Sequence, residues 1–429
     1  MKILVFAGAG ASVELGVPAM AQLAMDFRRH VGAWKVEPEL LGLLLHDQQD
    51  LEDLIEKLDG VCGSSEALEA LGFDQVGMNR ARSLQSEVEW FVQHACERVT
   101  SSGAELMWSS VLASTTSHEV VVATTNYDRA IELAANAMGL ALRDGFEPFG
   151  TSEVASWCDF PSSDGFAGNG CVTLLKLHGS TDWYELGGRP GQPVKLRHPM
   201  PLFGGGALRL PSVSQELTAA LILPSREKRV TRPPYLRLSQ VFLNAAERAD
   251  VIIFIGSSFR DPHLRSAART SAQHKPTFLV SRSNPNSTEI LGAVRIQATA
   301  SQFLLSMLPR ALNSIDPIST LTQIAAARPK AVDVFDLVGS ARDPRLSTSV
   351  RCAAIEGLWG DGIALGATVV VPLLADADDA VARFALGLVA DSFDATPLLA
   401  TARQRAERNG SHEFHDELAI LESLVKQPG

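Results

Sequence analysis

The sequence predicts a doubly wound α/β fold with a Rossmann-like parallel sheet, followed by an all-α domain of helical repeats. Short apolar runs rich in β-branched residues recur through the first three quarters of the 429 residues, and helical patterns separate them. Beyond residue 312 no further strand is predicted, and Ala, Leu, Val and Asp dominate. A hydrophobic content of 46% is ample for two cores.

The predicted strands are apolar on both faces, as expected for central strands of a parallel sheet that helices cover. They comprise residues 2–7, 119–124, 172–177, 251–255 and 277–280. Helical patterns occur at residues 20–30, 51–58, 84–99, 127–138, 236–248 and 261–272. Strands that alternate with helices in this way predict a sheet with helices on both faces.

Residues 144–211 are rich in Gly, Pro and Ser and are predicted to be largely loop. Long connections without secondary structure are uncommon in compact domains unless they are functional. We therefore expect a lid or a substrate-facing insertion over about residues 144–235. It would belong to a first domain that covers residues 1–312.

Residues 313–429 form the second predicted domain. Two similar segments, SVRCAA and AVARFA, each follow an aspartate-containing turn, and Val350 and Val381 within them are 31 residues apart. This spacing is short for a HEAT-type repeat but typical of paired-helix solenoids. The region loosely resembles HEAT-like repeats, whose helical hairpins would bury their apolar faces on the α/β domain or on another subunit.

Charge and cysteine content narrow the classes of partner. A formal net charge of −11 disfavours nucleic acid as the main ligand, because phosphate binding needs concentrated Lys and Arg. The basic cluster at residues 226–237 (REKRVTRPPYLR) is either a solvated loop or a phosphate- or partner-facing segment. The five cysteines form no C-x-x-C pair, which argues against a zinc site and suits reduced thiols in a cytoplasm.

The first residues weakly imitate a signal peptide, since Lys2 precedes an apolar run and small residues. Gly8 and Gly10 interrupt that run, and the following residues continue a strand–loop–helix unit, so we expect no secretion signal. No other apolar run approaches the ~20 residues that a membrane span needs. We expect a soluble, cytoplasmic protein.

A glycine-containing loop, Gly8-Ala9-Gly10-Ala11-Ser12, follows the first predicted strand. Residues without side chains let the backbone approach a pyrophosphate, which the N–H groups of a loop and a helix can bind. The pattern is G-x-G-x-S and not the dinucleotide fingerprint G-x-G-x-x-G. Alone, it predicts a nucleotide site only weakly.

Polar residues also follow three later strands, in TTNYD at residues 124–128, LKLHGS at 175–180 and IGSSF at 255–259. Doubly wound sheets bind their ligands at the carboxyl ends of the strands. A lone histidine at a strand end is more often structural than catalytic. Three polar strand ends together with the glycine loop favour a functional site.

These segments together resemble the bacterial SIR2-like NAD-binding domains, which are related to sirtuins. The glycine loop with Gly16-Val17-Pro18 resembles the family's GAG-x-S-x-x-x-G-[IV]-P. Residues 125–128 resemble its T-x-N-x-D element, and His178-Gly179 its catalytic His-Gly. Residues 256–258 resemble its G-[TS]-S segment, and all four occur in the family's order within about residues 1–310.

The resemblance implies NAD as the substrate, with no metal. Asn126 and Asp128 would hold the nicotinamide ribose and position a water molecule. His178 would act as general base, for which an ordinary pKa near ~6.5 is suited. Two further sets would bind the rest of NAD: Gly8, Ala9, Gly10 and Ser12 the pyrophosphate, and Gly256, Ser257 and Ser258 the adenosine half.

The chain departs from protein-deacylating sirtuins in two ways. Those enzymes follow the G-I-P with Asp-Phe-Arg, whereas this chain has Ala19-Met20-Ala21, and its Asp26-Phe27-Arg28 falls within the next predicted helix. They also carry a four-cysteine zinc module, and the cysteine spacing here does not provide one. HGSTDW at 178–183, the segment 224–228 and FRDPH at 259–263 look like SIR2-like domains of prokaryotic antiviral systems, which often hydrolyse NAD.

The resulting hypothesis is an NAD glycohydrolase that acts as an effector of anti-phage defence. We expect a homo-oligomer, with a partner defence protein such as an ATPase, and C-terminal repeats that hold the oligomer or receive the trigger. A protein deacylase or ADP-ribosyltransferase that uses the same NAD site, and a non-catalytic sensor of NAD or ADP-ribose, stay open as alternatives. Asp182, Arg226 and Asp261 either contribute to the site or have structural roles; Asp261 could cap the helix that starts with Pro262.

Overall fold

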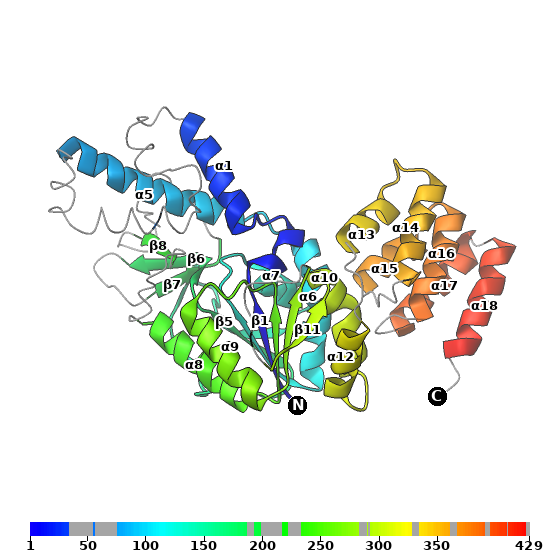
Figure 1. The fold of residues 1–429 in the computed structure, drawn as a ribbon. Coiled ribbons are helices and arrows are strands. Elements are labelled where there is room, and N and C mark those ends of the chain that lie inside the picture. Colours follow the sequence, from blue (N-terminus) through cyan, green and yellow to red (C-terminus); the bar gives the residue numbers. More distant parts are fainter. Residues whose placement is uncertain are drawn as a thin grey trace.

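The structure is a computed structural model that describes residues 1–33, 55, 75–186, 193–198, 217–221, 233–282, 290, 292–327, 334–360, 367–390, 395–409 and 411–425. The first part of the chain forms a parallel sheet with helices on both faces, and the C-terminal part forms a group of helices beside it (Figure 1).

A seven-stranded sheet forms the centre of the first part, in the order β11-β10-β9-β1-β2-β5-β3, and all its pairings are parallel. Its strands are β1 (Lys2–Ala7), β2 (Glu119–Thr124), β3 (Ala141–Arg143), β5 (Cys171–Lys176), β9 (Val251–Ile255), β10 (Thr277–Ser281) and β11 (Val294–Gln297). The five predicted strands are confirmed, and the short edge strands β3 and β11 are additional. The chain moves outward from β1 through β2 and later returns to β9 on its other side, so the switch point of the sheet lies at β1 and β9.

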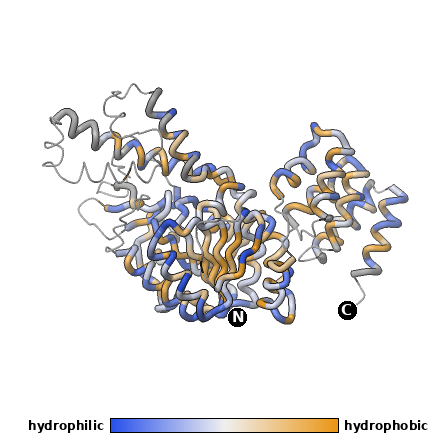
Figure 2. Tube along the Cα trace, viewed as in Figure 1, coloured by the Kyte–Doolittle hydropathy of each residue, from blue (hydrophilic) through white to orange (hydrophobic). Residues whose placement is uncertain are grey.

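Alternate residues of β1 contribute to two hydrophobic cores. Ile3, Val5 and Ala7 belong to one core, and Leu4 and Phe6 to the other. The first core includes residues of α1 (Met20–Ala33), α5 (Gln75–Cys96), α6 (Ser101–Ala113), α7 (Ala130–Ala137) and α12 (Pro317–Ala326). The second includes residues of α8 (Tyr235–Arg248) and α9 (Pro262–His274). Figure 2 shows the strands between them as the most hydrophobic part of this domain, and the doubly wound prediction is confirmed.

The predicted helices correspond to α1, α5, α7, α8 and α9, with differences at the ends. The helix predicted at residues 51–58 falls outside the described residues, apart from Ile55. Helix α6 was not predicted, since its sequence opens with Ser-Ser-Gly. Thr100 explains its start, because the Thr100 hydroxyl accepts a hydrogen bond from the Gly103 amide at 3.2 Å.

Residues 144–211 contain more strand than the sequence predicts, although most of the described residues among them lie outside strands. Besides β5, they include β4 (Val154–Ser156), β6 (Gly179–Leu186) and β7 (Pro193–Leu196). These join β8 (Leu217–Leu221) in an antiparallel sheet of order β4-β7-β6-β8. Tyr184 packs with Val194, Leu196 and Leu217 in a small core of this sheet, whereas Trp183 is buried in the second core of the main sheet. Turn-forming residues in this segment concealed strands whose pairing partners lie far along the chain.

Most of the basic cluster at residues 226–237 lies outside the described residues. Its last member, Arg237, lies on α8 and donates from Nε to Asp159 Oδ1 at 2.8 Å. A structural contact therefore accounts for this one arginine.

Residues after β11 continue as helices. A continuous helical stretch comprises α10 (Ala300–Gln302), a π-helical turn (Phe303–Met307) and α11 (Leu308–Leu312), and Leu321 of α12 still packs in the first core of the sheet domain. Another hydrophobic core joins α13 (Val334–Arg342), α14 (Thr348–Gly360), α15 (Ala367–Leu374), α16 (Asp379–Ala390), α17 (Ala395–Asn409) and α18 (His412–Val425). It also includes Leu106 of α6 and Leu305 of the π-helical turn, which connect it to the first domain. The all-α character is as predicted, while the likeness to HEAT repeats stays a prediction. Within the described ranges, no helix has the length and apolar composition needed to cross a membrane.

Candidate functional site

A pocket of about 120 Å³ lies at the carboxyl ends of the strands around the switch point. It includes most of the predicted site residues: Gly8, Ala9, Ser12, Asn126, Asp128, His178, Ser257 and Ser258. Val17, Pro18, Leu23, Cys96, Phe259, Arg260 and Asp261 also line it. Four segments distant in sequence thus meet where doubly wound sheets bind ligands.

Asn126, Ser12 and Asp128 are joined by hydrogen bonds. The Asn126 side-chain amide donates to Ser12 Oγ at 2.8 Å and to the Gly8 carbonyl at 2.9 Å. The Ser12 hydroxyl donates to Asp128 Oδ2 at 2.7 Å, and Asp128 Oδ1 accepts from the Ala130 amide at 3.0 Å. Both amide hydrogens of Asn126 are therefore used, so its carbonyl oxygen is the atom that can meet a ligand hydroxyl. Each oxygen of Asp128 can still accept a second hydrogen bond.

The glycines of the loop are required by packing between backbones. A Cβ on Gly8 would lie 2.7 Å from the Gly256 carbonyl oxygen, and a Cβ on Gly10 would lie 2.9 Å from Gly256 Cα. The amides of Gly8, Gly10, Ala11 and Ser12 all donate to backbone carbonyls. Packing against Gly256 therefore accounts for these glycines. Close approach of a pyrophosphate, which the sequence led us to expect, stays a prediction.

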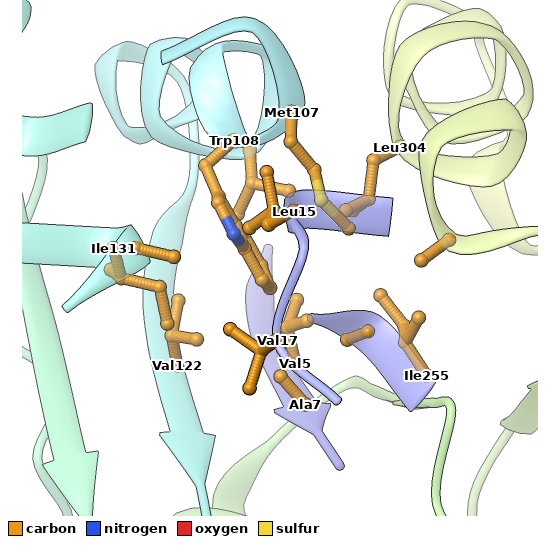
Figure 3. Packing of buried hydrophobic residues seen from close by; sticks show 14 of the residues in the cluster. Val5, Ala7, Leu15, Val17, Met107, Trp108, Val122, Ile131, Ile255 and Leu304 are labelled. Carbon is orange, nitrogen blue, oxygen red and sulfur yellow. The ribbon is translucent and has the colours of Figure 1, made fainter. Parts of the chain in front are cut away.

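The segment after the glycine loop is anchored on the side away from the pocket. Figure 3 shows Leu15 close to Met107 and Trp108 of α6. The Glu14 carboxylate accepts hydrogen bonds from Ser301 at the start of α10, from the amide at 3.0 Å and from the hydroxyl at 2.7 Å. The loop is thus fixed from both sides, as a preformed binding site requires.

His178 lies between β5 and β6 and is 6% exposed. Its Nε2 atom is 3.6 Å from Oδ2 of Asp261, which is within range of an ion pair but beyond a hydrogen bond. The turn that follows it requires glycine, since Gly179 has a φ of +87° and a Cβ there would lie 2.4 Å from the Ala220 carbonyl oxygen. Asp261 also caps α9, as predicted.

Lys176 lies beneath the site and was not predicted as a functional residue. Its side chain is 1% exposed, and its ammonium group donates to the backbone carbonyl of Asp128 and lies 3.6 Å from Glu132 Oε1. Burial raises the pKa of Glu132, while Lys176 lowers it. The sequence signal for this residue was a lysine within a largely apolar predicted strand, VTLLKL. A buried cation needs a specific partner, so such a lysine indicates a specific contact.

Cys96 of α5 is the thiol that lines the pocket. Burial, followed by the charge of Asp128, raises its pKa far above the usual value. The thiolate is the nucleophilic form of cysteine, so a thiol kept protonated in this way is unsuited to covalent catalysis.

Asp182, which the sequence left open between a site role and a structural one, belongs to a buried ion cluster. Lys195 of β7 donates to Asp144 Oδ2 at 2.5 Å and lies 3.6 Å from Asp182 Oδ2. Burial lowers the pKa of Lys195, but the charges of Asp182 and Asp144 outweigh it and raise the pKa above its usual value. The cluster links the small sheet to the end of β3. Arg226 lies outside the described residues.

Replacing Lys195 by methionine should lower the free energy of unfolding by about 3 kcal/mol, because Asp144 and Asp182 would stay buried without their cation. Urea denaturation measures the change. Arg345→Met is the matched control, since Arg345 pairs with Asp343 but its side chain is 87% exposed. We expect a control effect within about 0.5 kcal/mol. A loss at Lys195 no larger than that of the control would contradict the prediction.

The fold and the pocket together define an α/β protein with a pocket at the switch point of a parallel sheet. The family model described as a SIR2-like domain matches residues 120–295, which include Asn126, Asp128, His178 and the loop after β9. Residues 120–295 are therefore similar to a SIR2-like domain. The glycine loop after β1 precedes the matched region.

Three solved structures are similar to the chain at low sequence identity. One, from work on the mechanism and regulation of Sir2 enzymes, has 13% identity and a TM-score of 0.34, covering 76% of this chain and 93% of that chain. A sirtuin studied for substrate affinity has 12% identity and a TM-score of 0.28, covering 70% and 89%. Sir2 with the inhibitor EX-527, 2′-O-acetyl-ADP-ribose and deacetylated p53 peptide has 13% identity and a TM-score of 0.29, covering 70% and 90%. No curated protein matches the sequence of the chain.

Proposed function

We propose that this protein hydrolyses NAD at the bond between nicotinamide and ribose, releasing nicotinamide and ADP-ribose. The observation that supports this most directly is the meeting of Asn126, Asp128 and His178 in one pocket with the glycine loop and with Ser257 and Ser258. These residues come from the ends of four strands, and each lies in a sequence segment that resembles a motif of SIR2-like domains.

The chemistry of NAD suits such a pocket. Nicotinamide is positively charged in NAD and leaves as a neutral molecule without being protonated, so the protein must mainly stabilise an oxocarbenium-like ribose. His178 would accept a proton from a ribose hydroxyl or from the attacking water. The Asn126 carbonyl oxygen and the Asp128 carboxylate would accept hydrogen bonds from the ribose or that water.

A positively charged side chain would stabilise the bound pyrophosphate of NAD. Among the described residues that line the pocket, Arg260 is the one whose side chain carries a permanent positive charge. It directly follows the loop assigned to the adenosine half. We assign Arg260 to the pyrophosphate, with the hydroxyls of Ser257 and Ser258 beside it.

Water is the acceptor that the chain favours. The Asp-Phe-Arg of protein-deacylating sirtuins is replaced by Ala19-Met20-Ala21, and the cysteines have no zinc-module spacing. Cys96, the thiol in the pocket, is buried and is kept protonated. These features disfavour an acyl-peptide substrate and a covalent cysteine intermediate.

Depletion of NAD would halt metabolism, so an NAD hydrolase of this kind must be controlled. We propose that it acts in the cytoplasm as the effector of an anti-phage defence system, as a homo-oligomer and with a partner such as an ATPase. The C-terminal helices, whose core also includes Leu106 of α6 and Leu305, are the part of the chain that we assign to assembly or to receiving the trigger.

The purified full chain should be incubated with NAD, alone and with the proteins encoded by neighbouring genes, and the products separated by chromatography. Equal amounts of nicotinamide and ADP-ribose would support hydrolysis. Products that form only with an acylated peptide would identify a deacylase and overturn the proposal. Binding of NAD without turnover under every condition would instead identify a sensor.

A further inference from the structure

Asp261 contacts two different groups through its two carboxylate oxygens. Oδ1 accepts hydrogen bonds from the amides of His263 at 2.8 Å and Leu264 at 3.3 Å, which caps α9. Oδ2 lies 3.6 Å from Nε2 of His178. The side chains of Asp261 and His178 are only 9% and 7% exposed, so water screens their interaction weakly.

The backbone before Asp261 is held in a strained conformation. Phe259 has a φ of 53°, although it is a bulky residue, and it is buried against Phe254 with ring centroids 5.1 Å apart. Arg265 donates from Nε to the Phe259 carbonyl at 2.8 Å. Strain of this kind persists where the surroundings enforce it, and it is concentrated at functional sites. The loop therefore delivers the Asp261 carboxylate to the pocket in a fixed position.

Capping alone does not require this position. Asp316 caps α12 in the same manner, with Pro317 at the first helical position, and its carboxylate accepts from the Ser319 amide at 3.1 Å. That cap lies outside the pocket. Asp261 uses one oxygen for the same task, and its other oxygen faces the imidazole.

We propose that Asp261 is a positioning residue for His178: its carboxylate orients the imidazole ring and stabilises the protonated ring that forms when His178 accepts a proton. A base held by a third group is the general arrangement of catalytic histidines. The inference rests on the proposed function only in taking His178 as the base. Other titratable or charged residues line the same pocket: Cys96 from α5, Tyr127 and Asp128 from the loop before α7, and Arg260 from the loop before α9.

Asp261→Asn is the informative variant, because asparagine caps helices as well as aspartate does and removes only the charge. The protonation midpoint of His178 should be measured by NMR of the histidine ring resonances, with His178→Gln to identify the signal. We expect the midpoint to fall by about one pH unit or more in Asp261→Asn, since the ionised carboxylate favours the charged imidazole. Asp316→Asn should leave it unchanged.

Activity supplies the second readout. In Asp261→Asn, the acid limb of the pH profile of kcat/KM for NAD should move to lower pH by the same amount. We expect kcat to fall about tenfold with little change in KM, as for a residue that acts through the base. Asp316→Asn should match the unmodified protein in both parameters.

The protonation midpoint of His178 and the kinetics of NAD cleavage distinguish the role of Asp261 from the proposed function. An unchanged midpoint of His178 in Asp261→Asn would overturn the role of Asp261, whatever the protein catalyses. A lowered midpoint in a protein that does not cleave NAD would support the contact and would refute the proposed function instead. If Asp261→Asn does not fold, Asp261→Ser repeats the test, because serine also caps and carries no charge.

Discussion

Replacing His178 by alanine should lower kcat/KM for NAD cleavage by about 10²–10⁴-fold, the range typical for loss of a general base. Of the pocket-lining residues that the structure describes, His178 is the one whose ordinary pKa lies near neutrality. Its removal would leave the ribose hydroxyl or the water without a proton acceptor. Release of nicotinamide at saturating and at low NAD measures kcat and kcat/KM.

Two controls make the His178 result specific. Isothermal titration should show that His178→Ala still binds NAD, because the glycine loop and the Asn126 hydrogen bonds do not involve this side chain. His263→Ala should retain full activity, since His263 is exposed at the start of α9. Unchanged turnover in His178→Ala would exclude its role as the base.

Asn126→Ala would be a poorer test of catalysis than His178→Ala. The Asn126 amide joins the Gly8 carbonyl to Ser12, and Ser12 in turn joins Asp128. Its removal should disturb the loop, so binding and turnover would be lost together. Catalytic and structural roles therefore cannot be separated at Asn126 by truncation alone.

The central strands could be predicted because a strand covered on both faces is apolar along its whole length, and such a run is readable without knowledge of its neighbours. The edge strands β3 and β11 have no such pattern. In β3, residues 141 and 143 are exposed and residue 142 is half-buried, and β11 likewise alternates with exposed residues. Their pairing with the sheet is a long-range interaction that local sequence does not contain.

The small sheet was missed for a different physical reason. Strand β6 begins GSTD, and these residue types usually mark a turn. Here the same residues are buried, since Asp182 pairs with Lys195 and Trp183 packs against Phe146 with ring centroids 4.9 Å apart. Burial of turn-like residues depends on partners from other strands.

The location of the pocket could be predicted more reliably than the contacts that each of its residues makes. Polar residues at the ends of parallel strands converge on one edge of the sheet, so the pocket follows from the strand assignments. The bond between Ser12 and Asp128 joins positions 116 residues apart, and the second contact of Asp261 depends on where β5 ends. Sequence patterns gave candidates for these residues without revealing which atoms they would bond.

Gly256 is the clearest case in which the sequence predicted a place in the site but not the contacts made there. Replacing Gly256 by alanine should lower the free energy of unfolding by at least about 4 kcal/mol. The resemblance implied contact with adenosine, but Gly256 also has a φ of +61°, and a Cβ there would lie 2.4 Å from the Ala11 nitrogen and 2.5 Å from the Gly10 carbonyl carbon. These are backbone atoms of the glycine loop, so they cannot move aside unless the ends of β1 and β9 separate. Thermal and urea unfolding measure the loss.

Gly139→Ala is the matched control for Gly256→Ala. Its φ is +65°, nearly that of Gly256, yet nothing lies within 4 Å of the added Cβ. It should show only the cost of a left-handed alanine, about 1–2 kcal/mol. The difference between the two variants then isolates the backbone contact between the loops after β1 and β9. Equal losses would mean that the contact yields readily, in which case the glycines of the loop would be explained by ligand approach and not by packing.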